Sequence, residues 1–194
     1  ALKIGSFVDQ SSLEGVRELF CSKLSSTNGG AQWLSVVDMS DRYEEMWARD
    51  IVVDSQDNIV MTGNFIGTAS FGSVSTIASA GNEETYDLFA ASISSNGDWN
   101  WAIAGGGQES DTGNAIVIDS DGKYRIYGAM TGSAAIGNTM LTGTGTYTEY
   151  PLTATITSSG SWHSAEYFDH SGDVSMTISF ESPTISTSLT IPFK

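Results

Sequence analysis

The amino-acid sequence predicts an all-β protein of about three blade-like, four-stranded antiparallel repeats of roughly 65 residues, one of them split between the chain ends. Two observations predict this. The stretch DIVVDSQDNIVMTG at 50–63 returns at 115–128 as AIVIDSDGKYRIYG, with the same order of apolar run, acidic turn, apolar run and glycine. Further along, LFAASISSNGDWNW at 88–101 returns as PLTATITSSGSWHS at 151–164.

Four strands are expected in each repeat. The β-branched run Ile51–Asp54 is too short for a helix, and a polar turn joins it to Ile59–Gly63 as a tight hairpin. The third strand is Gly67–Ser75, rich in glycine and serine, and the fourth is Leu88–Ser94. Alternate residues of the fourth strand are apolar, which predicts one buried face and one wet face. These apolar residues are Phe89, Ala91 and Ile93.

The two ends of the chain carry partial copies of the repeat. LFCSKLSSTNGGAQW at 19–33 matches its late part, and FDHSGDVSMTIS at 168–179 resembles its acidic hairpin, with Asp169 in the place of Asp119. The chain is therefore expected to be one domain over 1–194. It divides into a half unit at 1–47, units at 48–112 and 113–166, and a half unit with a terminal strand at 167–194. The stretches 10–20 and 40–48 are compatible with single helical turns or with acidic loops.

Composition narrows the class of partner. The chain has 23 acidic and 8 basic residues, a net charge of −15, which disfavours binding to nucleic acid or to anionic membranes. No apolar run approaches the roughly 18 residues of a membrane span. The single cysteine, Cys21, allows no intramolecular disulfide and is expected to be a small packing residue. Many Ser, Thr, Gly and Asn residues and few lysines resemble the composition of secreted surface proteins, so an extracellular or cell-surface location is expected.

The motifs resemble the SBBP repeat, a β-propeller-associated repeat of secreted bacterial and archaeal proteins. The resemblance rests on AxxIVVDSxDNIVMTGNFxGTASFG at 48–72 and DLFAASISSNGDWNWA at 87–102, and related motifs extend it over nearly the whole chain. It implies four-stranded antiparallel blades without a common catalytic site. Three units are fewer than the 4–8 blades of a propeller. The split unit is therefore expected to close within one chain or to be completed by a neighbour.

Open sheet edges favour assembly, because their unpaired N–H and C=O groups template pairing with another strand. The tail TISTSLTIPF at 184–193 is uncharged and β-prone. It is interpreted either as a strand that pairs with a second molecule or as a plain terminal strand of its own sheet. The chain is expected to form a homo-oligomer through β-edge pairing, with six assembly residues: Tyr167, Val174, Ile178, Ile185, Leu189 and Ile191.

The acidic turns are the candidate metal sites. DSQDN at 54–58 and DSDGK at 119–123 place carboxylates two or three residues apart, as oxygen-only calcium loops require. Aspartates also cap tight turns, and neither stretch completes a known calcium loop, so structural turns are favoured and calcium stays an option. The residues concerned are Asp54, Asp57, Asp119 and Asp121. No other cofactor is expected.

Catalytic residues are not identified. The two histidines, His163 and His170, lie near strand ends and turns, and no GxSxG motif occurs. Four aromatic residues near strand ends are candidates either for stacking on a glycan or for packing between units: Trp99, Trp101, Tyr150 and Trp162.

The sequence therefore predicts a non-enzymatic extracellular structural subunit that self-assembles as a surface layer, filament or ring. The alternatives are a glycan- or protein-binding propeller-like module and a calcium-stabilised adhesion module.

Overall fold

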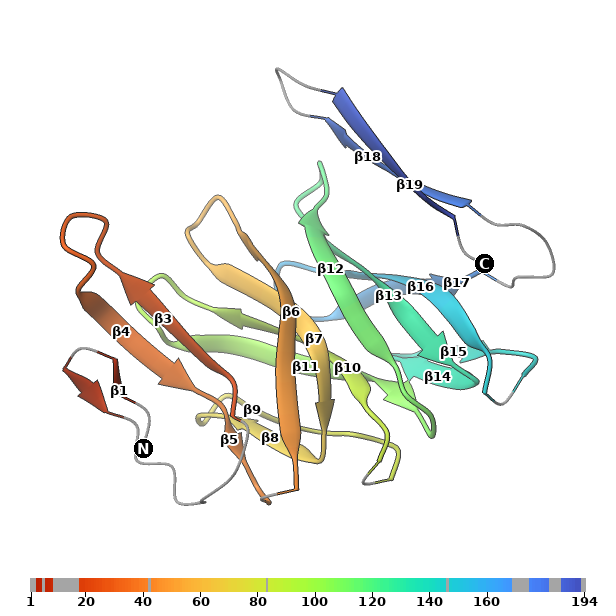
Figure 1. The fold of residues 1–194 in the computed structure, drawn as a ribbon, viewed down its shortest axis with the longest axis horizontal. Helices are drawn as coiled ribbons and strands as arrows, with labels where there is room; N and C mark the ends of the chain where they lie inside the picture. Colours follow the sequence, from red (N-terminus) through yellow and green to blue (C-terminus); the bar gives the residue numbers. More distant parts are fainter. Residues whose placement is uncertain are drawn as a thin grey trace.

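The computed structural model describes residues 3–4, 6–8, 18–41, 43–82, 84–145, 147–168, 175–181 and 186–192 (Figure 1). Within these residues every strand pairing is antiparallel and no helix occurs. The prediction of an all-β, antiparallel chain is confirmed. No helix in this part of the chain is long and apolar enough to span a membrane.

A four-stranded meander occupies the middle of the chain. Its strands, in sheet order, are β6 (Glu45–Val53), β7 (Ile59–Ile66), β10 (Asp87–Ile93) and β11 (Trp99–Gly107). A hairpin of β8 (Thr68–Phe71) and β9 (Ser75–Ala78) interrupts it between β7 and β10. The stretch 67–75, predicted as one strand, thus turns back on itself after Phe71. We call this sheet the first meander.

A second meander follows with the same strand order. Its strands are β12 (Thr112–Ile118), β13 (Tyr124–Thr131), β16 (Glu149–Ile156) and β17 (Trp162–Tyr167), and its inserted hairpin is β14 (Ser133–Ile136) with β15 (Thr139–Thr142). Both meanders have a bulge at the same place in the first strand, between Ala48 and Asp50 and between Gly113 and Ala115. The two meanders therefore share their strand order and the position of this bulge.

The N-terminal region holds only part of this pattern. β3 (Phe20–Leu24) pairs with β4 (Ala31–Val36), and β5 (Asp38–Met39) continues after β4 and pairs with β8 of the first meander. β14 pairs in the same way with the end of β11. Each inserted hairpin thus ties its meander to the preceding sheet. Two further hairpins lie at the chain ends, β1 (Lys3–Ile4) with β2 (Phe7–Val8), and β18 (Ser175–Glu181) with β19 (Ser186–Pro192).

Two apolar cores separate these layers. One lies between β3–β4 and the first meander and includes Trp33, Met61 and Phe89. The other lies between the two meanders and includes Leu88, Ile116 and Leu152. Because the first meander is covered on both sides, Leu88 and Phe89 are both fully buried although they point to opposite faces. The prediction of one wet face on this strand is wrong.

Tryptophan side chains link successive layers. The Trp33 Nε1 group on β4 donates a hydrogen bond of 2.9 Å to the Ser95 carbonyl, in the turn between β10 and β11, and the ring packs on Gly97 of that turn. Trp101 on β11 packs in the same way on Gly160, in the turn between β16 and β17. Trp33 of the N-terminal sheet thus lies on a turn of the first meander, and Trp101 of the first meander lies on a turn of the second. The three layers therefore stack in chain order.

The stretch 40–48 forms no described helix: β6 begins at Glu45, where the chain pairs with β7. Trp162 lies opposite Ile156, the position that Trp99 occupies opposite Ile93, as the alignment of 88–101 with 151–164 predicts. Most of the stretch 10–20 lies outside the described residues.

Candidate assembly interface

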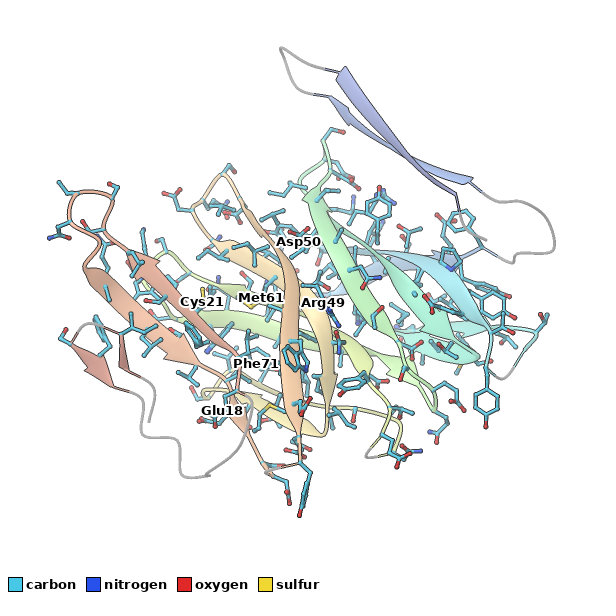
Figure 2. All side chains as sticks on the ribbon, viewed as in Figure 1. Glu18, Cys21, Arg49, Asp50, Met61 and Phe71 are labelled. Atoms are coloured by element: carbon cyan, nitrogen blue, oxygen red, sulfur yellow. The ribbon has the colours of Figure 1, made fainter. Side chains whose placement is uncertain are left out.

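The first feature of the candidate interface is the edge of β3. In the meanders the corresponding strands are paired on both sides, β10 with β7 and β11, and β16 with β13 and β17. Within the described residues, β3 pairs with β4 alone. Figure 2 shows Cys21 on this strand, at the far end of the sheet stack from β12–β13. The N-terminal sheet thus lacks the counterparts of β6 and β7.

The second feature is an exposed isoleucine on the first meander. Ile51 lies opposite Met61, and Ile116 lies opposite Ile126, so the two isoleucines occupy the same register position in the two meanders. Ile116 is 1% exposed, because β12 packs against β6 and β7 of the preceding sheet. Ile51 is 55% exposed. The hairpin that would cover it is the one that the N-terminal sheet lacks.

A hydrogen bond fixes how the meanders dock at this position. The Ile116 backbone N–H donates to Asp50 Oδ2 at 2.9 Å, from β12 to the bulge of β6. Figure 2 shows Asp50 and the neighbouring Arg49 on β6. The Arg49 Nε group donates to Asn64 Oδ1 at 3.0 Å and so stays on its own sheet. The observed docking of β12 on the β6–β7 hairpin shows how a hairpin covers this position in the fold.

The third feature is the outward face of β3. Phe20 and Leu24 correspond to Phe89 and Ile93, which are fully buried between layers, yet both are about half exposed. The free edge of β3, the exposed Ile51 and this apolar face lie at the N-terminal end of the stack. We call the edge of β3 together with Ile51 the acceptor.

The C-terminal hairpin lies at the other end of the stack (Figure 1). β19 pairs with β18 over seven residue pairs, from Ser175–Pro192 to Glu181–Ser186. The tail at 184–193 therefore has a partner immediately upstream, in agreement with the alternative of a terminal strand on its own sheet. Neither strand pairs with β3, so closure of the split unit within one chain is not observed.

The described members of the predicted assembly residues lie in β17, β18 and β19. Tyr167 ends β17, opposite Leu152, and its hydroxyl donates to the Thr142 carbonyl at 2.6 Å. Ile178, Leu189 and Ile191 lie in β18 and β19. Val174 and Ile185 lie outside the described residues, as do Asp169 and His170 of the proposed third acidic turn.

The acidic turns are held by protein groups. Asp54 accepts hydrogen bonds from the Gln56 and Asn58 backbone N–H groups, the Asn58 amide and the Tyr124 hydroxyl. Burial opposes ionisation of Asp54, but these hydrogen bonds outweigh it and lower its pKa. Burial and the bond to Asp54 raise the pKa of Tyr124 to about 12. This turn therefore also links the two meanders.

The second acidic turn is satisfied in a similar way. Asp119 forms a fork of hydrogen bonds with the Arg125 guanidinium, the shortest 2.7 Å, and Asp121 accepts from the side chain and backbone of Lys123. In the first acidic turn, Asp57 has a left-handed backbone at φ 61°, as a tight turn requires. No cluster of three metal-ligating side chains occurs in the described part of the chain. The geometry is that of capped turns, and calcium binding stays a prediction.

The candidate glycan-stacking residues take part in packing. Trp99 meets Phe71 edge to face with ring centroids 4.8 Å apart. The Trp162 Nε1 group donates to the Ala104 carbonyl at 3.0 Å, which places its ring against the preceding sheet. Tyr150 is buried, and its hydroxyl accepts from the backbone N–H groups of Thr144 and Gly145. The expectation that Tyr150 is exposed is wrong, and Trp101 packs on Gly160.

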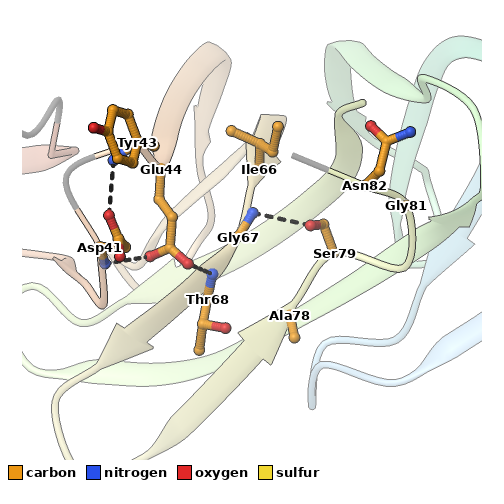
Figure 3. A pocket seen from close by; sticks show the side chains of 10 residues that line it. All are labelled: Asp41, Tyr43, Glu44, Ile66, Gly67, Thr68, Ala78, Ser79, Gly81 and Asn82. Carbon is orange, nitrogen blue, oxygen red and sulfur yellow. Dashed lines mark hydrogen bonds between the residues drawn. The ribbon is translucent and has the colours of Figure 1, made fainter. Parts of the chain in front are cut away.

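A hollow of about 320 Å³ lies beside β8 and β9 (Figure 3). Asp41, Tyr43 and Glu44 line one side, and Ser79 and Asn82 line the other. The Glu44 carboxylate accepts from the Asp41 and Thr68 backbone N–H groups, at 2.7 and 2.9 Å. The Glu44 carboxylate in the hollow therefore stabilises the loop before β6 and its contact with β8.

Sequence analysis did not single out a buried pair of carboxylates at the junction of the two meanders. Asp87 and Asp111 are 2% and 0% exposed. Asp87 Oδ2 accepts from the Ala80 backbone, Asp111 accepts from the Gly107 and Thr131 backbones, and Asp87 Oδ1 is buried without a hydrogen-bond partner in the described residues. Burial raises the pKa of Asp87 to about 6 and, with the Asp87 charge as an additional cause, that of Asp111 to about 7.

Sequence patterns do not reveal this pair, because Asp87 opens the motif at 87–102 whereas Asp111 lies outside the quoted motifs, and the two meet only through the sheet packing.

Comparison with known proteins adds no family assignment: no protein-family model and no curated protein matches the chain. The resemblance to the SBBP repeat therefore stays a prediction.

Proposed function

We propose that the protein is a non-enzymatic extracellular structural subunit that self-assembles by β-strand pairing at the acceptor. The observation that supports this most directly is the contrast between Ile51 and Ile116 at one register position. A hairpin of the preceding sheet covers Ile116, and the described residues contain no corresponding hairpin over Ile51. A strand from another molecule would pair with β3 and remove apolar surface from water at the same time.

The interpretation of the chain as blade-like units supports the same proposal. In this view the two meanders are complete units and β3–β4 is the late half of another. A unit without its first hairpin leaves one edge of an inner strand unpaired. Assembly satisfies these backbone groups, whereas a monomer leaves them to water.

The outer face of the second meander does not carry the features of an assembly contact. On the outer face of the second meander, Arg125 and Glu166 occupy the register positions that Val60 and Ile103 occupy in the first. Ser164 likewise replaces Trp101, the residue that packs on the next layer. Terminal units of repeat arrays carry such polar outer faces. We therefore place the assembly contact at the acceptor and not on this face.

The test is the mass of the protein in solution, measured by light scattering over a range of concentrations. Ile51→Asp puts a charge into the proposed contact and is expected to weaken association by at least about tenfold, since an isoleucine contributes about 1.5–3 kcal/mol when fully buried. The monomer fold should survive, because Ile51 is exposed in the single chain.

Ile118→Asp is the matched control. Ile118 is also an exposed isoleucine on the first strand of its meander, but it lies on β12 of the second meander and belongs neither to β3 nor to β6, which carry the acceptor. It should leave the mass unchanged. A wild-type protein that is monomeric at all concentrations, or equal effects of both variants, would contradict the proposal.

The hollow beside β8 and β9 supports the alternative of a glycan-binding module. Tyr43 at its rim is 69% exposed and offers a ring for stacking on a sugar. Tyr43→Ala would then abolish binding in a glycan array while leaving the solution mass unchanged. Loss of binding without change of mass favours this function over assembly.

A further inference from the structure

We infer that the segment that occupies the acceptor is the β18–β19 hairpin of a second copy of the chain. This inference rests on the proposed function and adds the identity of the partner strand. It predicts a head-to-tail contact, in which the C-terminal end of one molecule completes the N-terminal sheet of the next.

Strand number and direction support this assignment. In the first meander, β10 pairs with β7, and β7 is the second strand of the antiparallel β6–β7 hairpin. In the part of the chain that the structure describes, no hairpin of this kind pairs with β3. β18 and β19 form an antiparallel hairpin with seven residues in each strand. In the proposed contact, β19 of one molecule lies beside β3 of the other, in the place that β7 takes beside β10. β18 then takes the place of β6.

The two faces of the hairpin differ in the way that the acceptor requires. Because side chains alternate along a strand, the register places five apolar residues on one face: Met176, Ile178, Phe180, Leu189 and Ile191. The other face carries mainly serine and threonine. An apolar face covers Ile51, and a polar face remains toward water.

Charge also favours the hairpin as the occupant. Among the residues of β18 and β19, Glu181 is the only ionisable side chain, although the whole chain has a net charge of −15. Docking a segment with little charge avoids most of the repulsion between two acidic molecules.

The arrangement of the layers makes a second copy the source. In Figure 1 the β18–β19 hairpin lies above β12 and β13 of the second meander, well away from the β3–β4 sheet at the left. The contact is heterologous, because each molecule offers one acceptor and one hairpin. Such contacts produce a ring if the rotation closes and a filament if it does not.

The test uses Cys21, the single cysteine of the chain, which lies in β3. Cys21 packs against the core that faces the first meander, the side that the apolar face of the hairpin would join. Cysteine is introduced into the full-length chain at Leu189 or Ile191, on the same face of β19, and at Ser188 or Thr190, on the other. Cysteines on neighbouring strands form a disulfide only when they share a face.

Diamide serves as the two-electron oxidant that joins two thiols, and a mildly alkaline pH offsets the raised pKa that burial gives the Cys21 thiol; under these conditions we expect disulfide-linked dimers and longer ladders for L189C or I191C. We expect about tenfold less cross-linking for S188C and T190C, whose side chains lie on the other face. Wild-type protein treated in the same way controls for Cys21–Cys21 pairing.

A disulfide within one molecule, or cross-linking from the polar face alone, would overturn the inference. If no variant cross-links while the wild type is oligomeric and Ile51→Asp disrupts it, the hairpin is not the partner but the acceptor stands. A wild type that is monomeric at every concentration removes both the inference and the proposed function.

Discussion

Asp87 and Asp111 converge on the backbone of Gly106, although one lies in β10 and the other directly before β12. A Cβ atom at Gly106 would overlap Asp87 Oδ1 and would lie 2.9 Å from Asp111 Oδ2. The glycine thus allows two buried carboxyl groups to approach the same strand. Their hydrogen bonds hold the loop before β10, the end of β11 and the end of β13 in one place.

This pair predicts that the protein is more stable in mild acid than at alkaline pH. The folded pKa values, about 6 and about 7, lie above the ordinary value of 3.8, so the folded state binds more protons than the unfolded state between these limits. The stabilisation is complete below about pH 4 and is lost as the pH rises through 6 and 7. Each pKa unit corresponds to about 1.4 kcal/mol, so the two shifts together set an upper limit on the order of 7 kcal/mol for this loss. Urea unfolding at several pH values measures it.

Asp87→Asn should flatten this pH dependence, because it removes one of the two charges. The control Asp121→Asn changes an exposed carboxylate paired with Lys123 and should keep the wild-type slope. A wild-type free energy of unfolding that rises between pH 5 and pH 8 would show that folding does not raise the pKa values of this pair.

Gly160 and Gly122 provide a matched pair for measuring the contact between layers. Both lie in turns with left-handed backbone, at φ 83° and 80°. A Cβ atom at Gly160 would overlap the Trp101 ring, whereas one at Gly122 meets nothing within 4 Å. Gly122→Ala is expected to cost about 1 kcal/mol for the backbone alone, and Gly160→Ala about 1–3 kcal/mol more for the overlap.

Equilibrium unfolding of the two variants gives the difference. In the background Trp101→Ala the extra cost of Gly160→Ala should disappear, because the ring is no longer there. Equal costs for the two glycine variants would argue against the packing of Trp101 on this turn.

Removal of divalent cations is expected to leave the protein unchanged. Asp54, Asp119 and Asp121 each accept hydrogen bonds from protein groups, so a cation would have to displace existing partners. The melting temperature with a chelator should equal that with added calcium. A rise of several degrees on addition of calcium would instead assign a metal to these turns.

Local patterns in the sequence predicted the strands well. The acidic turns at Asp54 and Asp119 do join β6 to β7 and β12 to β13, because short Asx turns fix their own hydrogen bonds. The strand predicted at Leu88–Ser94 corresponds to β10. These features depend on residues close together in the chain.

Features that depend on packing between layers were not predictable in this way. Alternation along β10 cannot show that a second sheet covers its polar-looking face, so Ala90 and Ser92 were not expected to be buried. The candidate interface was predictable only in part: the repeat indicated that one unit was incomplete. The exposure of Ile51 and the pairing of β18 with β19 required the structure.

The polar outer face of the second meander yields the last prediction. Arg125 and Glu166 stand where Val60 and Ile103 stand in the first meander, and Arg125 is held by Asp119. The double variant Arg125→Val, Glu166→Ile restores the apolar residues of an inner layer. It should expose an apolar patch and cause additional association, even together with Ile51→Asp. Light scattering detects this as a rise in mass that Ile51→Asp does not reverse. If the double variant keeps the mass of its parent, these two side chains are not what ends the stack.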